Sequence, residues 1–95
     1  MAELEISRTC RTASSERYIL SLSEEHVASL DLHFVSGDQI EATLVVLNAD
    51  VIDESELPPL LDKLHYRLFA NDEHQRARFL VMYGKFQGEY SPDGT

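Results

Sequence analysis

The sequence predicts one α+β domain, a two-layer sandwich in which a single helix covers a mainly antiparallel sheet. Three observations carry this prediction. Apolar residues occupy every second position through most of 17–48, as in strands with one buried face. Leucines recur at helical spacing between 57 and 68, and an apolar run follows at 77–83.

The chain length of 95 residues is typical of one domain. We therefore expect residues 1–95 to form a single domain whose ordered core spans about 17–86. The polar segment 1–16 is expected to be partly ordered. The segment 87–95, rich in Gly, Ser and Pro, is expected to be a flexible tail.

The alternating segment predicts a three-stranded meander with turns at 23–26 and 36–38. Residues opposite each other in an antiparallel pair share a face. A two-residue turn at 37–38 would mix the faces, so we predict the three-residue loop 36–38. That loop gives the pairs Phe34–Ile40, Leu32–Ala42 and Leu30–Leu44. The same reasoning predicts a three- or five-residue connection between the first two strands.

Both ends of the meander carry further signals. Leu4 and Ile6 alternate with polar residues, which fits an additional edge strand at the N-terminus. The last meander strand ends in the run 44–47, which is apolar on both faces, and alternation fails where both faces are covered. Val45 and Leu47 therefore need a cover, supplied by the N-terminal segment, the chain end or a second subunit.

A helix is predicted after the meander. Asp53 or Ser55 can cap its N-terminus, and Asp53 with Glu56 has the spacing of a capping box. Pro58 and Pro59 are tolerated only in the first turn, where backbone N–H groups have no helical partner. The expected inward face consists of Leu57, Leu60, Leu61, Leu64 and Leu68. Asn71 and Asp72 mark the expected exit.

The run 77–83 is almost wholly apolar, so periodicity alone does not separate a strand from a buried helix. Its aromatic residues and the nearby Gly84 and Gly88 favour a strand, whereas Asp72 and Gln75, spaced like a second capping box, favour a helix. We predict a strand that runs parallel to the third meander strand and lies beside the first.

Composition narrows the functional classes. Seventeen acidic residues against eight basic ones give a net charge of −9, which repels nucleic acid and anionic membranes. Arg76, Arg78 and Lys85 form the only local excess of base. A single cysteine excludes an intramolecular disulfide, and residues 1–5 lack the features of a signal peptide. No apolar run is long enough to cross a bilayer. We expect a cytoplasmic protein that binds neither nucleic acid nor membrane directly.

No catalytic, cofactor-binding or metal-binding residues are predicted. The acidic cluster within 50–62 lacks the glycine of a calcium loop and fits the N-terminus of a helix. Arg8 and Arg11 flank Cys10, but the segment lacks the helical start that surrounds most catalytic cysteines. The four histidines do not stand in pairs at zinc-site spacing; they are His26, His33, His65 and His74.

These observations favour a small acidic protein-interaction or regulatory module, non-enzymatic and self-associating, with a protein partner that can be a second copy in a homodimer. The candidate interface residues are Val45, Leu47, Tyr66 and Phe69, apolar positions beyond the regular core pattern. One alternative is a ligand-binding domain or enzyme with a cleft between sheet and helix. Residues to inspect for such a cleft are Tyr83, His65, Tyr66 and Arg67. Further alternatives are an acidic nucleic-acid mimic that inhibits a basic partner, and an assembly subunit that adds a strand from another chain.

Overall fold

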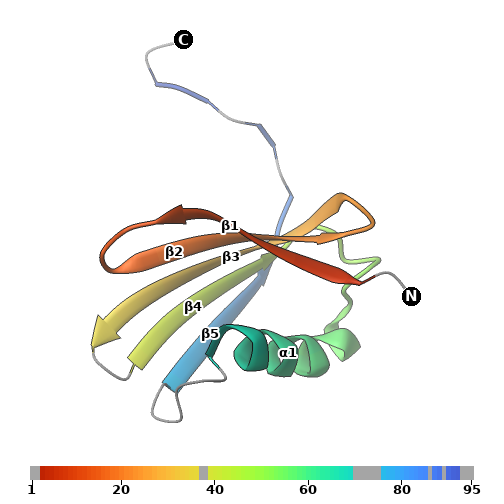
Figure 1. Ribbon diagram of the computed structural model, residues 1–95. Coiled ribbons are helices and arrows are strands. Elements are labelled where there is room, and N and C mark those ends of the chain that lie inside the picture. Colours follow the sequence, from red (N-terminus) through yellow and green to blue (C-terminus); the bar gives the residue numbers. More distant parts are fainter. Residues whose placement is uncertain (1–2, 37–38, 70–75, 86, 89, 93–95) are drawn as a thin grey trace.

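The protein is an α+β fold built on an open, mostly antiparallel five-stranded sheet with one helix (Figure 1). The computed structural model describes residues 3–36, 39–69, 76–85, 87–88 and 90–92. Strand order in the sheet follows chain order, with β5 parallel to β4 and all other neighbours antiparallel. The elements are β1 (Leu4–Arg11), β2 (Ser15–Leu22), β3 (Glu25–Ser36), β4 (Gln39–Val46), the 3-10 turn η1 (Glu54–Glu56), α1 (Leu57–Phe69) and β5 (Arg76–Tyr83).

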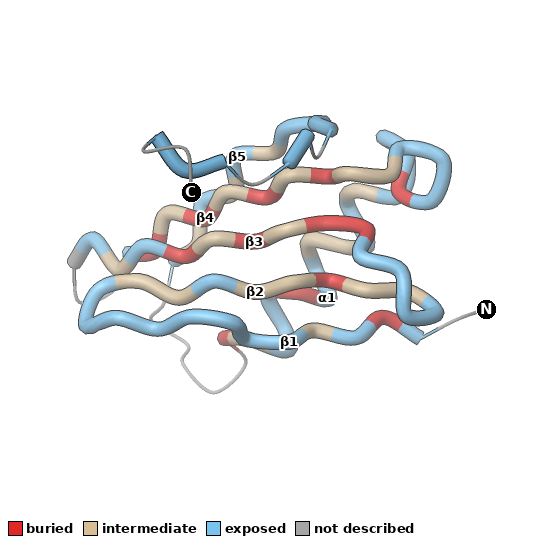
Figure 2. The backbone as a smooth tube through the Cα atoms, turned by 90° about the horizontal axis from the view of Figure 1, so that it is seen from above, coloured by how far each residue is buried: buried red, intermediate tan, exposed pale blue. Residues whose placement is uncertain are grey.

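The even-numbered residues of the meander strands form the inner face of the sheet, as predicted, except His26, which pairs with Ser21 on the other face. Their buried members alternate with more exposed neighbours along β3 and β4, and the burial is concentrated on the central strands (Figure 2). Leu64 and Phe69 of α1 belong to the same cluster of buried side chains. The buried residues of the inner face are Leu4, Leu20, Ala28, Leu30, Leu32, Ile40, Ala42, Leu44 and Val46.

The predicted β3–β4 register is confirmed, but the predicted connections are wrong. Phe34 pairs with Ile40, and the two strands then continue in register to the pair of Ala28 with Val46. The connection, however, is two residues long rather than three, because the pairing shifts by one residue at Val35. This shift is a β-bulge, which keeps both faces in phase although only two residues separate the strands.

The β2–β3 connection uses the same device. Only Ser23 and Glu24 separate the strands, where three or five residues were predicted. Both have positive φ, 51° and 69°, which is the backbone of a type I′ hairpin turn. A register shift at Val27 restores the alternation, and this bulged residue is fully buried.

The final strand is confirmed as parallel to β4, but its predicted place beside the first meander strand is wrong. β5 pairs directly with β4, from Gln39–Arg76 to Val46–Tyr83. The other flank of the meander is occupied by β1, which pairs with β2 through seven of its eight residues. β1 and β5 are therefore the two edges of the sheet.

The capping prediction for α1 is confirmed at Asp53. Its carboxylate accepts hydrogen bonds from the backbone N–H of Ser55 (2.9 Å) and of Glu56 (3.2 Å). These bonds satisfy donors that would have no partner at the start of the helical segment. Pro58 and Pro59 follow in the first turn of α1. The predicted exit at 71–72 and the competing capping box ending at Gln75 lie outside the described residues.

Candidate interaction site

The two edges of the sheet differ in how well they are protected against pairing with another chain. An edge strand offers unpaired N–H and C=O groups, and proteins block such edges with bulges and charged side chains. β1 has both devices. Its pairing shifts between Arg8 and Cys10, and Arg8 and Arg11 form ion pairs with Glu16 of β2 at 3.3 and 3.5 Å. In addition, Arg67 of α1 donates a hydrogen bond to the carbonyl oxygen of Leu4 (3.2 Å).

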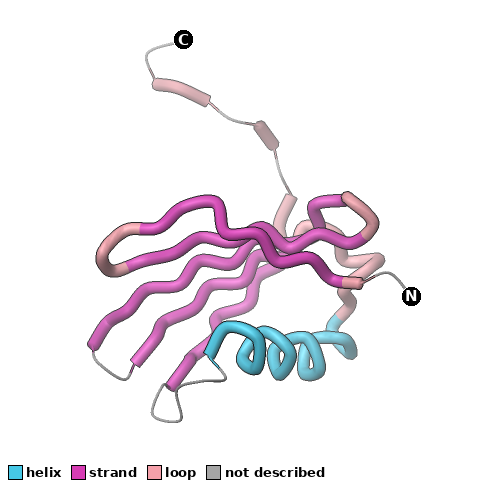
Figure 3. Tube along the Cα trace, in the orientation of Figure 1, coloured by secondary structure: helices cyan, strands magenta, loops and turns pink. Residues whose placement is uncertain are grey.

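β5 lacks these devices over its second half. It pairs with β4 in an unbroken register, and within the described chain no strand pairs with its outer side. The half from Phe79 to Tyr83 has no charged residue. The described residues beyond Gly84 lead away from the sheet (Figure 3), so they leave this edge open.

The backbone groups that point outward from β5 can be assigned. The N–H of Gly84 donates to the carbonyl oxygen of Val46 in β4 at 2.9 Å. N–H and C=O groups of alternate residues point to the same side of a strand, so even-numbered residues of β5 bond to β4. The outward groups therefore belong to the odd-numbered residues Ala77, Phe79, Val81 and Tyr83.

The side chains of β5 divide between the two faces of the sheet. Ala77, Phe79 and Val81 pack against the core on the α1 side. Leu80 and Met82 project from the open face, which has no helix, and are 61% and 46% exposed. Leu80 and Met82 lie beside Thr43 and Val45 of β4, respectively, so the open face carries an apolar area at this edge.

Val45 is half-buried because the end of β5 covers it. A Cβ atom at Gly84 would lie only 3.2 Å from Cγ1 of Val45, so glycine permits the close approach here. We predicted a cover from the N-terminal segment, the chain end or a second subunit. Of these, the structure places the C-terminal part of the chain, at Gly84, next to Val45.

Charge is distributed unevenly along β5. Arg76 and Arg78 lie near its start, on the open face. Asp53 and Glu54 lie near its end, where the hydroxyl of Tyr83 donates to the carbonyl oxygen of Ile52 at 3.1 Å. Burial, together with the charges of these two carboxylates, raises the pKa of Tyr83. The basic residues at the start of β5 and the acidic residues near its end therefore lie on opposite faces of the sheet, and the segment of β5 between them is uncharged.

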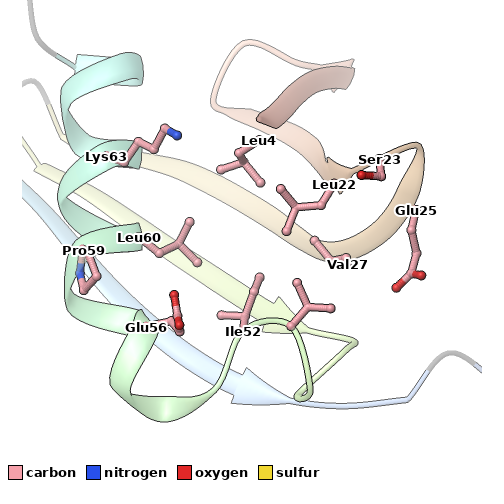
Figure 4. Close-up of a pocket in the computed structure, with 11 residues that line it drawn as sticks. Leu4, Leu22, Ser23, Glu25, Val27, Ile52, Glu56, Pro59, Leu60 and Lys63 are labelled. Carbon is pink, nitrogen blue, oxygen red and sulfur yellow. The ribbon is translucent and has the colours of Figure 1, made fainter. Parts of the chain in front are cut away.

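A second feature is an open cavity of about 600 Å³ between α1 and the β1–β2 part of the sheet (Figure 4). In Figure 4 the side chains of Leu4, Leu22 and Leu60 approach one another across it. The charged residues Glu25, Glu56 and Lys63 are exposed. Glu25 also accepts a hydrogen bond from the side-chain amide of Asn48 (2.5 Å). The complete lining is Leu4, Leu22, Ser23, Glu25, Val27, Val51, Ile52, Glu56, Pro59, Leu60 and Lys63.

The residues predicted for an interface do not form one surface. Val45 lies on the open face of the sheet, and Leu47 follows β4 and donates its N–H to the carbonyl oxygen of Val27 at 2.8 Å. Tyr66 lies on the outer side of α1, 73% exposed. Phe69 is buried in the core, with its ring edge-on to that of His65 at 5.6 Å between centroids. Of the four, only Val45 adjoins the β5 edge.

The residues suggested for a catalytic cleft are also dispersed. His65, Tyr66 and Arg67 are exposed on α1, whereas Tyr83 ends β5. None of these four residues lines the cavity described above. No group of three or more His, Cys, Asp or Glu residues arranged to hold a metal ion occurs in the part of the chain that the structure describes.

Cys10 is an exposed free thiol at the outer edge of the sheet. It is the residue opposite Arg17, on the open face, whereas Arg8 and Arg11 pair with the inner-face residues Tyr18 and Glu16. The two flanking arginines are therefore occupied by Glu16 on the other face. The hydroxyl of Tyr18 donates to the same carboxylate (2.8 Å); burial, then this hydrogen bond, raises the pKa of Tyr18.

Comparison with known proteins gave no significant match to a family model, a curated protein or a solved structure. Among the described residues, no helix has the length and apolarity required to cross a membrane.

Proposed function

We propose that this protein is a non-enzymatic interaction module that binds a polypeptide strand along the free edge of β5. The observation that carries the proposal is the contrast between the two sheet edges. β1 is blocked by a bulge and by paired arginines, whereas β5 presents a regular backbone beside exposed Leu80 and Met82. Strand addition uses such an edge: backbone hydrogen bonds supply affinity, and alternate side chains supply specificity.

The charge of the protein supports binding to a protein rather than to nucleic acid or an anionic membrane. A net charge of −9 disfavours nucleic acid and anionic lipid, and it steers association toward surfaces that carry basic residues. The same charge is what an acidic nucleic-acid mimic would need, but an uncharged apolar strand edge is better suited to backbone pairing than to imitation of a phosphate chain.

The experiment compares two substitutions of equally exposed apolar residues. Leu80 is 61% exposed on β5, and Val35, 60% exposed, lies near the end of β3, which β4 separates from β5. The tagged protein and its Leu80→Lys and Val35→Lys variants are used to capture partners from the source cells. Partners recovered by the wild type and by Val35→Lys should be lost with Leu80→Lys. An identical partner set for all three proteins would refute the proposal.

A second function, binding of a small apolar ligand, is favoured by the cavity. Its volume falls within the usual range of ligand pockets, and aliphatic side chains surround it. The dye 1-anilinonaphthalene-8-sulfonate should fluoresce strongly when bound there. Val51→Trp, at a lining position 39% exposed, should reduce the enhancement, whereas Val35→Trp should not. Equal fluorescence from both variants would remove this second function.

A further inference from the structure

We infer that the strand received by β5 is the β5 of a second copy, paired antiparallel about a two-fold axis at Val81. This inference rests on the proposed function, since it requires the β5 edge to accept a strand. Two-fold symmetry makes the interface self-complementary: each residue i of one copy lies opposite residue j of the other, and j lies opposite i. A two-fold interface at this edge therefore requires that each residue of β5 be compatible with the β5 residue that antiparallel pairing places opposite it.

The cross-strand side-chain pairs between two antiparallel copies of β5 are most favourable when the axis passes through Val81. With the axis at Val81, Leu80 lies opposite Met82 of the second copy on the open face. Phe79 lies opposite Tyr83 on the inner side. Apolar and aromatic cross-strand pairs of this kind stabilise a sheet. Arg78 then lies opposite Gly84, which has no side chain to oppose it.

Neighbouring registers are poorer. An axis at Leu80 places Arg78 opposite Met82 twice, and an axis at Met82 places Phe79 opposite Lys85 twice. Each of these registers gives a charged side chain an apolar cross-strand partner. The Val81 register gives no such pair between 78 and 84; its pair of Ala77 with Lys85 involves a residue beyond the end of β5 at Tyr83.

The backbone groups fit the same register. The odd-numbered residues of β5 point their N–H and C=O groups outward, as the Gly84–Val46 hydrogen bond establishes. Antiparallel strands bond through pairs of residues that exchange both groups. An axis at Val81 pairs odd residues with odd residues, so Val81 bonds to Val81 and Phe79 bonds to Tyr83. The result is one continuous sheet across both copies.

The charges on β5 favour antiparallel over parallel pairing of two copies. Arg76 and Arg78 lie near the start of β5 on the open face. Parallel pairing would bring the arginines of the two copies together, and like charges opposite each other destabilise a sheet. Antiparallel pairing about Val81 instead places the arginines of each copy beside the end of the other β5.

The oligomeric state is tested by sedimentation equilibrium on the purified full chain, over a range of concentrations. The wild type and Val35→Lys should form a species of twice the monomer mass of 10.8 kDa. Leu80→Lys should raise the dissociation constant roughly tenfold or more, because a lysine then replaces an apolar member of two cross-strand pairs. Circular dichroism should show the same fold for all three proteins. A wild type that remains monomeric would overturn the inference.

The register is tested by disulfide formation in a Cys10→Ser background. Leu80 and Met82 form a pair that is not hydrogen-bonded across the axis, with Cα atoms about 4.5 Å apart, which suits a disulfide. A mixture of Leu80→Cys and Met82→Cys chains should cross-link readily. Leu80→Cys alone should not, because residues 80 of the two copies are offset. Cross-linking of Leu80→Cys alone would instead show an axis at Leu80 and overturn the assigned register.

Failure of this inference can be distinguished from failure of the proposed function. A monomeric wild type that still captures other proteins through Leu80 would overturn the dimer and leave strand addition at β5 standing. A monomeric wild type whose partner set is unaffected by Leu80→Lys would overturn both.

Discussion

Replacing Leu64 with alanine tests whether α1 is held to the sheet through its apolar side. Leu64 is fully buried in the cluster that includes the inner face of the sheet. A Leu→Ala substitution at a fully buried position lowers the free energy of unfolding by about 2–5 kcal/mol, and the loss is smaller where neighbouring side chains can move into the space left behind. Leu60, one turn earlier, lines the open cavity. This space allows partial collapse, so we expect about 3 kcal/mol rather than the upper limit.

The assay is thermal denaturation monitored by circular dichroism, at concentrations below those at which the protein self-associates. At 4–8 °C per kcal/mol for a domain of this size, Tm should fall by roughly 12–24 °C. Tyr66→Ala is the control, since Tyr66 lies on the same helix but is 73% exposed. It should change stability by no more than about 0.5 kcal/mol. Equal effects of the two substitutions would refute the packing of α1 on the sheet.

Two further substitutions test the surface interactions. Asp53→Ala should lower the denaturation midpoint at pH 7, because the hydrogen bond from Ser55 and then those from the backbone hold the Asp53 pKa below its ordinary 3.8. Because the pKa of Asp53 is lower in the folded state, its ionised carboxylate stabilises the fold above pH 3.8, and this stabilisation is lost as the pH falls through the folded-state pKa. The difference in denaturation midpoint between Asp53→Ala and the wild type should therefore vanish in acid. A difference that does not change with pH would contradict this. For the Arg17–Asp31 ion pair (2.7 Å, side chains 64% and 35% exposed), a double-mutant cycle should give a coupling of about 0.5 kcal/mol that weakens in 1 M salt. A larger coupling that salt does not change would show that solvent screens the pair less than its exposure implies.

The sequence predicted the faces of the meander correctly because strand periodicity is a local property. The pairing of Phe34 with Ile40 followed from the requirement that apolar residues share one face. Turn length did not follow, because a two-residue turn with one bulged residue gives the same alternation as a three-residue loop. Val27 and Val35 could have indicated the bulges, because each is an apolar residue at an odd position next to a predicted connection between strands.

The candidate site was harder to predict from the sequence than the meander, because it depends on the order of the strands in the sheet. Leu80 and Met82 adjoin a free strand edge because β5 is the outer neighbour of β4, whereas a place of β5 beside β2 would have left β4 as an edge. That choice depends on β1, which the alternation of Leu4 and Ile6 only partly indicated. Phe69 was expected at an interface because it falls partly off the leucine stripe, yet it is buried at the end of α1.

Amide hydrogen exchange along β5, measured by NMR, tests the pairing of this edge most directly. The N–H groups of Phe79, Val81 and Tyr83 point away from β4 and gain a partner only when a second strand adds. We predict slow exchange of these three amides at concentrations where the dimer forms, and fast exchange in Leu80→Lys or on dilution. Fast exchange at every concentration, with the neighbouring Leu80 and Met82 amides protected, would contradict the account.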